Sequence, residues 1–331
     1  MRLLRGSRLR IVLVSGLALF LLALVGGVIT LKMTANHYLN NVERLPDPFV
    51  SIPPSTRPSP VDGGTTFLLI GVDAEAKDAG GRSDALMVAR ISSNRDHAVI
   101  ISIPRDTWMD VPGHGMRKIN AAFALGGPSL AVQTVEQLTE LRIDHVAVIG
   151  FDGFRAMTDA VGGVEITIPR ESAGSYSQLP SGTQTLNGEQ ALAYVRQRYG
   201  LPNGDLDRTH RQQNFLRALT SQIMDRQTLT DPSKVNALLD AATEAISVDS
   251  GLKNDDLWRL VMEAPKLRSG MRFLNAPVDR LDSVVDSDGV EQSVVFLNEA
   301  RCAELWKAIA TDGVEDYLAK YDGDVLGPTP R

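Results

Sequence analysis

Residues 11–31 form an apolar run, IVLVSGLALFLLALVGGVITL, that contains no charged side chain. A helix that crosses the hydrocarbon core of a membrane needs about 20 such residues. A cleaved secretory signal is the alternative, but its apolar core spans about 7 to 15 residues and ends at a small-residue cleavage site. The run found here is longer and stops at Lys32, so we expect a transmembrane helix.

Four arginines precede this run with no acidic residue among them: Arg2, Arg5, Arg8 and Arg10. Positive charge gathers on cytoplasmic flanks, so we expect the N-terminus in the cytoplasm and the rest of the chain outside the cell membrane. The expected parts are a cytoplasmic tail (1–10), a transmembrane helix (11–31), an extracellular stalk (32–64), one folded domain (65–321) and a C-terminal tail (322–331). The stalk is inferred because residues 47–64 are rich in Pro, Ser and Gly.

The chain contains 34 Lys and Arg against 40 Asp and Glu, a formal net charge of -6. Because four of the cations precede the apolar run, the external part is more acidic still, and general attraction to nucleic acid is disfavoured. Against this background, the stretch YVRQRYGLPNGDLDRTHRQQ (194–213) carries four arginines. The cluster suggests one defined anionic ligand, and solvated Arg–Asp pairs are the alternative.

Cysteine and histidine usage gives no metal or disulfide signal. The lone Cys302 falls on the apolar face of a predicted helix over residues 298–310, where a core thiol is expected. The five histidines lack the spacing of a metal site.

From residue 65 onward, apolar runs typical of strands alternate with helical patterns. Strands are predicted over 66–72, 85–91, 97–103, 145–150, 164–168 and 271–275, and helices over 128–142, 152–163, 188–198, 207–226, 231–245 and 254–264. This order predicts an α/β domain, a three-layer sandwich in which helices cover both faces of a mixed central sheet.

The arginine cluster has a spacing that suits phosphate. Asp205 or Asp207 is a natural N-cap for the helix that follows, on which Arg208, Arg211 and Gln212 fall on one face. A helix N-terminus favours an anion, and the planar guanidinium matches phosphate oxygens two at a time. Two further residues at the end of the preceding helix, Arg196 and Arg198, would complete a cradle.

Two aspartates flank a Gly-rich loop between the first two predicted strands. Asp73 ends one strand and Asp84 opens the next, so both carboxylates can reach the same edge of the sheet. Such a pair can hold Mg²⁺ that also binds phosphate oxygens, although each aspartate can equally cap its own loop. Arg82 is a partner for Asp84 or a further phosphate ligand.

Two more motifs offer charged residues for a site. A buried strand run ends in a proline and is followed by Arg105 and Asp106, where sheets of this class commonly carry their sites. In RKINAAFALGG, Lys118 precedes a helix that closes on Gly126 and Gly127. Lys118 is either a phosphate contact or an exposed lysine.

Six segments in order resemble the LytR-CpsA-Psr family of Gram-positive cell-envelope enzymes. They are FLLIGVD...GRSDALMVARI, VIISIPRDTWMDVPG, KINAAFALGGPSLAVQTVEQLT, VGGVEITIP, LNGEQALAYVRQRY and GDLDRTHRQQNFLRAL. The resemblance covers residues 66–219, and the later QSVVFLNEA resembles the last element of actinobacterial members. One departure is the loop GLPNGD, which is often acidic in the family.

The resemblance implies a membrane-anchored phosphotransferase. Such enzymes move a glycopolymer from a polyprenyl-pyrophosphate carrier to peptidoglycan, form a phosphodiester and release polyprenyl phosphate. By position, Asp73 and Asp84 match the aspartates associated with Mg²⁺ or Mn²⁺, Asp84 also being counted as catalytic. The arginines that match those around the pyrophosphate are Arg105, Arg198, Arg208 and Arg211. Further pyrophosphate-binding positions are Arg82, Lys118, Arg196, Asp205 and Gln212.

A polyprenyl chain also needs an apolar groove. The helix NAAFALGGPSLAVQTVEQL has more apolar positions than one core face requires, and we expect it to bind lipid through Phe123, Leu130, Val135 and Leu138. The alternative is a helix buried between the sheet and a neighbouring element. A general base is not identified, and Asp84 and Asp106 are both open.

Three other functions compete with transfer. A pyrophosphate hydrolase would use the same cradle with water as acceptor. A membrane-bound transcriptional attenuator is disfavoured, because about ten cytoplasmic residues are too few for a DNA-reading fold. A carbohydrate-binding module is disfavoured because aromatic residues make up 5% of the chain and offer few stacking platforms.

Overall fold

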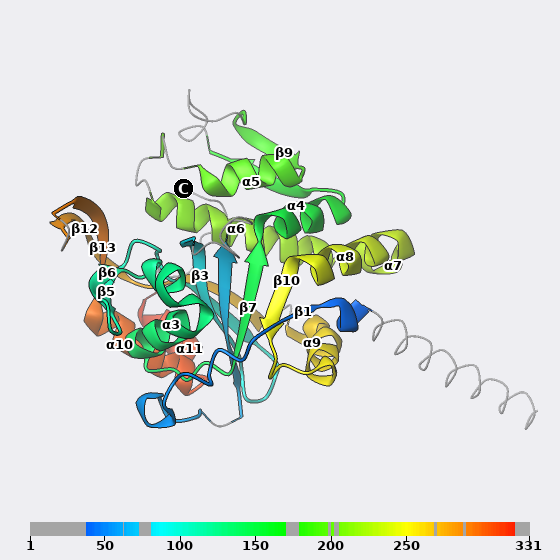
Figure 1. Ribbon diagram of the computed structural model, residues 1–331. Coiled ribbons are helices and arrows are strands. Elements are labelled where there is room, and N and C mark those ends of the chain that lie inside the picture. The colour runs from blue at the N-terminus through cyan, green and yellow to red at the C-terminus, as the bar shows by residue number, and fades with distance from the viewer. Residues whose placement is uncertain are drawn as a thin grey trace, which may run out of the picture. The chain divides into compact units, whose positions relative to one another are not determined.

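The computed structural model describes residues 38–61, 63–72, 81–169, 179–197, 200–201, 205–267, 270–286 and 289–321, the side chains of residues 205 and 206 excepted. Its central sheet is mixed, and the strand order is β1-β10-β7-β2-β3-β4-β11 (Figure 1). In that order the strands are β1 (Glu43–Leu45), β10 (Ile246–Asp249), β7 (His145–Gly150), β2 (Thr65–Val72), β3 (Ser83–Ile91), β4 (Ala98–Ser102) and β11 (Met271–Asn275). β2 runs parallel to β7 and antiparallel to β3.

β2 is buried on both faces, which explains why its sequence, TTFLLIGV, is apolar almost without interruption. Leu68, Ile70 and Val72 share one core cluster. Phe67 and Leu69 pack into other clusters on the opposite face, because side chains alternate along a strand. The sheet therefore needs cover on both sides.

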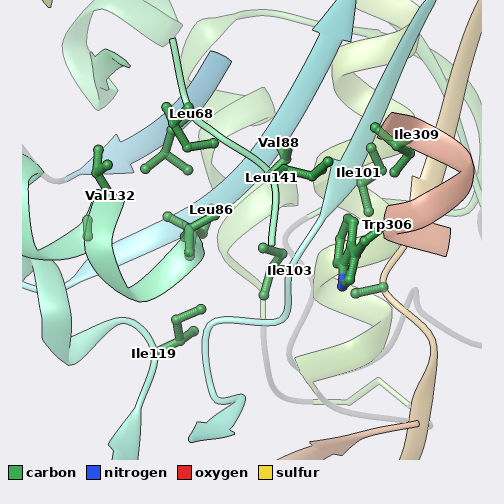
Figure 2. Close-up of a cluster of buried hydrophobic side chains, with 14 of the residues drawn as sticks. Leu68, Leu86, Val88, Ile101, Ile103, Ile119, Val132, Leu141, Trp306 and Ile309 are labelled. Carbon is green, nitrogen blue, oxygen red and sulfur yellow. The ribbon is translucent and has the colours of Figure 1, made fainter. Parts of the chain in front are cut away.

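The first face is covered by α3 (Ala121–Thr139), α10 (Glu299–Ala310) and α11 (Val314–Lys320). Figure 2 shows Trp306 and Ile309 of α10 beside Ile101 of β4. Each large apolar side chain buried in this way contributes about 1.5 to 3 kcal/mol to stability. Cys302 is buried on α10 in the same cluster, which confirms the predicted core thiol.

The second face is covered by α9 (Asn254–Leu267) and α6 (Asp205–Ile223). Leu257 and Leu260 of α9 pack against the cluster of Phe67, and Leu216 of α6 packs against Met87. The predicted arrangement, helices on both faces of a mixed sheet, is confirmed.

A further group of helices lies beyond the end of β7 (Figure 1). It comprises α4 (Phe151–Ala160), α5 (Gly188–Arg196), α7 (Arg226–Thr230), α8 (Pro232–Ala245) and the ribbon β8 (Val164–Ile168) with β9 (Gly182–Leu186). The strand predicted over 164–168 exists, but it lies outside the central sheet. Its burial alternates, with Ile166 buried and Thr167 exposed, so it covers helices with one face and could not serve as a strand buried on both sides.

Two more ribbons and two short strands of the central sheet had no sequence signal strong enough to predict them. The ribbons are β5 (Trp108–Val111) with β6 (Gly115–Lys118), and β12 (Val278–Val285) with β13 (Glu291–Leu297). The edge strand β1 and its neighbour β10 contain three and four residues. Short strands of mixed polarity contain too few alternations between apolar and polar residues to be distinguished from loops.

α3 is kinked where its sequence predicts a break. Gly126 and Gly127 depart from helical geometry, and Gly127 has a φ of 59°, a left-handed conformation that glycine adopts without steric cost. Pro128 then begins the second segment, because proline suits the first turn of a helix. The sequence predicted one helix that ends at these glycines and another that begins at residue 128. In the structure these are the two halves of α3.

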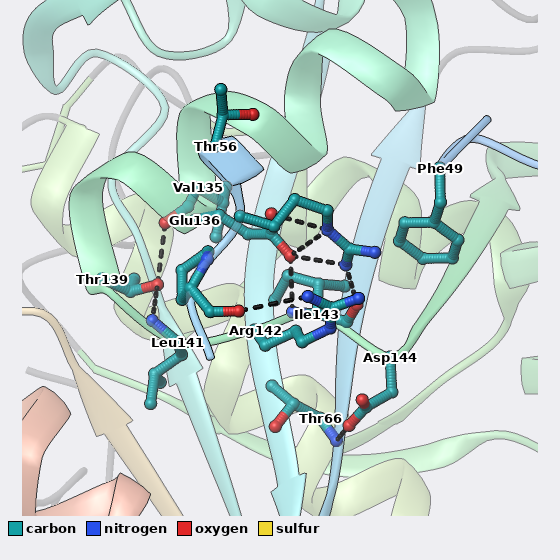
Figure 3. Close-up of polar contacts among 12 residues, drawn as sticks. Phe49, Thr56, Thr66, Val135, Glu136, Thr139, Leu141, Arg142, Ile143 and Asp144 are labelled. Carbon is teal, nitrogen blue, oxygen red and sulfur yellow. Dashed lines mark hydrogen bonds and ion pairs between the residues drawn. The ribbon is translucent and has the colours of Figure 1, made fainter. Parts of the chain in front are cut away.

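Part of the predicted stalk is folded against the domain. β1 pairs with β10, the short helix η1 (Pro54–Thr56) follows, and Ile52 is buried in the core cluster of the first face. Arg57 donates to both carboxylate oxygens of Glu136 and to the carbonyl of Ile143. Figure 3 shows Glu136 at the centre of these contacts, where it also accepts from the Ile143 amide at 2.9 Å.

The compact unit begins at Val42, upstream of the boundary expected at residue 65. The proline-rich segment looked like a spacer, yet its buried arginine and isoleucine fix it to α3. The predicted membrane helix at 11–31 and the tail after residue 321 lie outside the described residues. Within the part of the chain that the structure describes, no helix is long and apolar enough to cross a membrane.

Loss of the Arg57 contacts should destabilise the domain. The two side chains are 7% and 3% exposed, so Arg57→Met leaves the Glu136 carboxylate buried without its cation. We expect a loss of about 3 kcal/mol in the free energy of unfolding, measured by urea denaturation. Lys320→Met, which breaks the exposed pair with Glu304, is the control and should change stability little. Equal effects of the two variants would contradict the structural role of Arg57.

Candidate active site

A cavity of about 250 Å³ lies where β2 and β7 end and β3 begins. Gly71, Gly150 and Asp84 line it from these three strand ends. β4 runs in the same direction as β2, so Arg105, shortly after β4, reaches the same edge of the sheet. The carboxyl ends of parallel strands are where open α/β sheets commonly bind ligands.

Apolar side chains form most of the cavity wall. Except for Ile70, which packs in the core of the first face, they come from the second face of the sheet and from the helices packed beside it. The apolar lining residues are Leu69, Ile70, Ala85, Met87, Ile149, Phe151, Phe154, Val195 and Leu216. An apolar chain could be enclosed here without leaving polar groups unsatisfied.

Five described lining residues are polar. Three are cations, Arg105, Arg196 and Arg208, and the others are Asp84 and Gln212. One carboxylate against three guanidinium groups leaves this part of the cavity with net positive charge. The cavity therefore combines an apolar wall with an anion-binding region.

Arg105 is held by carboxylates on two sides. Its Nη1 lies 2.6 Å from Asp84 Oδ1, and its Nε lies 3.9 Å from Asp106 Oδ2. Lys118 Nζ in turn lies 3.1 Å from Asp106 Oδ1. The four side chains form a row of alternating charge that orients the Arg105 guanidinium.

The backbone around Arg105 is fixed as well. The amide of Asn120, the residue before α3, donates to the Arg105 carbonyl at 3.2 Å, and the Val295 amide of β13 donates to the Asp106 carbonyl at 2.9 Å. The segment after β4 is thus tied to α3 and to the β12–β13 ribbon. A guanidinium on such a segment has little freedom to move.

α6 and α5 supply the other polar groups. Arg208 is 3% exposed, and Gln212, one turn later, places its Nε2 at 3.4 Å from the Asp84 carbonyl. Arg196 ends α5 and is exposed, and its guanidinium lies 4.9 Å from the centre of the Phe151 ring. A cation this close to an aromatic face is attracted by the ring's negative face, which helps to hold the Arg196 side chain beside the cavity.

Arg211 does not line the cavity, although it shares a predicted helix face with Arg208. Its Nη1 donates to Gln197 Oε1 at 2.8 Å, and its guanidinium lies 4.6 Å from the centre of the Tyr194 ring. Burial lowers the pKa of this guanidinium, although Tyr194 and Asp207 act in the opposite direction. The structure thus separates two arginines that spacing alone had grouped.

Comparison with known proteins identifies the family of this chain. The sequence matches the model of the LytR_cpsA_psr family over residues 30–311. The chain belongs to the LytR-CpsA-Psr family. The resemblance inferred from six short segments is thereby confirmed.

Curated relatives within the LytR-CpsA-Psr family include the cell wall biosynthesis protein LcpA of Corynebacterium glutamicum. It is 32% identical, over 72% of this chain and 56% of its own length. The teichoic acid transferase TagU of Enterococcus faecalis is 33% identical over 60% of this chain and 65% of its own length. The chain thus spans between half and two thirds of the length of these relatives.

Solved structures of family members share the fold. Bacillus subtilis TagT is 26% identical, with a TM-score of 0.59 over 77% of this chain and 92% of TagT. TagT bound to LIIa-WTA is 27% identical, with a TM-score of 0.61 over the same shares. Bacillus subtilis TagV, at 23% identity and a TM-score of 0.63, supports the fold alone.

The structure brings together five of the residues matched to family motifs: Asp84, Arg105, Arg196, Arg208 and Gln212. Asp73, Arg198 and the side chain of Asp205 lie outside what the structure describes. Of the remaining candidates, Arg82 is exposed and does not line the cavity, and Lys118 is bound to Asp106. Lys118 therefore contacts a neighbour of Arg105, and the structure places neither residue in the cavity.

The four α3 residues expected to bind lipid lie in hydrophobic cores. Val135 is fully buried in the core of the first face with Phe123, and Leu138 packs against that core. Leu130 is buried with Val111 beneath the β5–β6 ribbon. None of the four lines the cavity. The apolar residues of α3 pack on two sides of the helix, against the sheet and against the β5–β6 ribbon.

The apolar wall comes instead from residues that sequence reasoning had assigned to the core or passed over. Leu69 and Met87 lie on strands whose two buried faces look alike in sequence. Phe151 and Phe154 are three residues apart on α4, but Phe151 precedes the helix predicted over 152–163, and helical spacing does not reveal an open space beside a helix face.

The cavity arginines should bind an anion that offers several phosphate oxygens. We expect Arg208→Ala to weaken the binding of inorganic pyrophosphate at least tenfold, because a buried charge-assisted donor is lost. Calorimetric titration measures the affinity. Arg259→Ala, which removes an exposed arginine of α9, is the matched control and should leave the affinity unchanged. Unaltered binding of pyrophosphate by the Arg208 variant would show that Arg208 is not part of the anion site.

Proposed function

We propose that this protein transfers a glycopolymer from a polyprenyl-pyrophosphate carrier to peptidoglycan, forming a phosphodiester and releasing polyprenyl phosphate. The observation that supports this proposal is the cavity, in which an apolar wall adjoins three arginines. A ligand that fits both regions has a hydrocarbon chain joined to a multiply charged anion. The names of the relatives agree, since TagU is a polyisoprenyl-teichoic acid–peptidoglycan teichoic acid transferase.

The proposed reaction exchanges one phosphorus–oxygen bond for another. A hydroxyl oxygen of a peptidoglycan sugar attacks the phosphorus that carries the polymer, and the hydroxyl loses its proton. The bond from that phosphorus to the bridging oxygen of the pyrophosphate breaks. Polyprenyl phosphate leaves with the bridging oxygen and its electron pair, so the products balance the substrates.

The protein's part in this reaction is to position groups and to neutralise charge. Negative charge grows on the departing phosphate, and Arg105, Arg196 and Arg208 would stabilise it from fixed positions. The carboxylates around Arg105 hold its guanidinium in place before substrate binds, so little reorganisation is needed. The apolar wall would hold the lipid and exclude water from one side of the pyrophosphate.

A divalent cation, Mg²⁺ or Mn²⁺, belongs to the same proposal. In the described part of the chain, no cluster of three His, Cys, Asp or Glu side chains could hold a metal. Asp84 nevertheless fits a site with few protein ligands: one of its oxygens accepts from Arg105, and a carboxylate has further lone pairs. Asp84 and Asp73 would hold the ion, which would add positive charge beside the pyrophosphate.

We further propose that residues 11–31 anchor the protein in the cell membrane with the folded domain outside. The uncharged run and the four arginines before it support this orientation. A protease added to intact cells should degrade the domain while a cytoplasmic marker stays whole. A domain that resists the protease until the membrane is opened would contradict the orientation.

Transfer can be tested with the full chain in detergent, a polyprenyl-pyrophosphate-linked polymer and peptidoglycan. We expect polymer joined to peptidoglycan through a phosphodiester, with activity abolished by EDTA and restored by Mg²⁺. Arg208→Ala should lower kcat about a hundredfold or more, because a preorganised donor to a developing oxyanion contributes roughly 3 to 4 kcal/mol. Arg259→Ala should transfer at the unmodified rate.

The products separate this function from its alternative. Free polymer phosphate without any linkage to peptidoglycan would indicate a hydrolase and overturn the transfer proposal. Equal rates of transfer for Arg208→Ala and Arg259→Ala would show that the cavity takes no part in the reaction.

A further inference from the structure

The last turn of α5 ends in an unusual arrangement. The final carbonyls of a helix have no partner within it, and they need donors from elsewhere. Here the donors come from the next helix: Gln212 Nε2 lies 3.5 Å from the Val195 carbonyl, and Arg211 Nη1 lies 3.5 Å from the Tyr194 carbonyl. Neighbouring residues of α6 thus reach the end of the helix that carries Arg196.

The strongest contact in this arrangement joins Arg211 to the residue that stops the helix. Gln197 leaves helical geometry, with φ −58° and ψ 129°, and its Oε1 accepts from Arg211 at 2.8 Å. Arg196 immediately precedes it and lines the cavity. The position of Gln197 therefore determines where the Arg196 backbone leaves the helix.

Arg211 is in no position to meet a substrate. It is 2% exposed, it lies over the Tyr194 ring, and it does not line the cavity. Tyr194 is itself fully buried, and burial raises the pKa of its phenol, so the ring stays neutral beneath the guanidinium. Burying a cation is costly, and the contacts of Arg211 with Gln197 and the Tyr194 ring offset part of that cost.

We propose that Arg211 is a positioning residue: it fixes Gln197 and the last turn of α5, and through them it sets Arg196 at the cavity. The inference concerns the same site and rests on the proposed function only for its effect on transfer. Its effect on anion binding can be measured without any transfer. It separates Arg211, which holds Arg196 in place, from Arg196 and Arg208, which line the cavity.

A double-mutant cycle with inorganic pyrophosphate as the probe tests the proposal in the full chain. Arg196→Ala should weaken binding about tenfold, and Arg211→Met, which keeps the apolar stem of the side chain, should weaken it about threefold to tenfold. If Arg211 acts through Arg196, the double variant should bind no more weakly than Arg196→Ala alone.

Two other outcomes would overturn the proposal. If the two effects multiply, Arg211 contacts the anion independently of Arg196. If Arg211→Met lowers thermal stability but the folded variant binds pyrophosphate as tightly as the unmodified chain, its role is structural alone. Affinity is therefore measured at a temperature where each variant is folded, and Arg259→Ala again serves as the control.

A second variant covers the case in which Arg211→Met does not fold. Gln197→Ala removes the acceptor from a half-buried position and leaves the guanidinium intact. The proposal requires the same non-additive behaviour with Arg196→Ala, and unchanged affinity in Gln197→Ala would contradict it. Because the probe is pyrophosphate, a failure to detect polymer transfer would count against the proposed function and leave this test unaffected.

Discussion

The pairing of β2 with β3 on one side and β7 on the other is the interaction on which the site depends. Because β3 runs antiparallel to β2, the residue that opens β3 lies beside the residues that end β2. Because β7 and β4 run in the direction of β2, their ends arrive at the same edge. The mixed sheet therefore collects Asp84, Gly150 and Arg105 at one place, although they are distant in sequence. A fully parallel sheet would carry the start of β3 to the opposite end.

Burial decides what each arginine of the cluster can do. Arg208 is buried and lines the cavity, so an anionic ligand there would lie beside its guanidinium. Arg211, one turn further along α6, is buried against Tyr194 and Gln197 and does not line the cavity. Arg196 keeps contact with solvent and rests on Phe151. The same residue type thus serves three purposes within two adjacent helices.

Sequence reasoning predicted the inner strands and the main helices, since these follow from apolar runs, but it named Arg82 as the partner of Asp84, whereas the structure pairs Asp84 with Arg105. It could not separate Arg208 from Arg211, because helical spacing fixes the angle between two side chains but not the neighbour that each one meets. It placed the lipid on α3 because Phe123 and Val135 look alike whether they face a core or a groove. It interpreted residues 47–64 as a spacer because their composition is rich in proline, and composition does not show that the side chain of Arg57 is buried against Glu136. In each case the missing information was tertiary.

The order of strands in the sheet has a consequence for how the protein is made. The inner strands β7, β2, β3 and β4 all come from residues 65–150, whereas their outer neighbours β10 and β11 come from residues 246–275. β1, near the start of the chain, can pair only after β10 has been synthesised, about two hundred residues later. Contacts of such long sequence separation form slowly. During translation, a nascent chain could therefore complete the centre of its sheet early while both flanks wait for later residues, a stage at which exposed strand edges call for protection by chaperones.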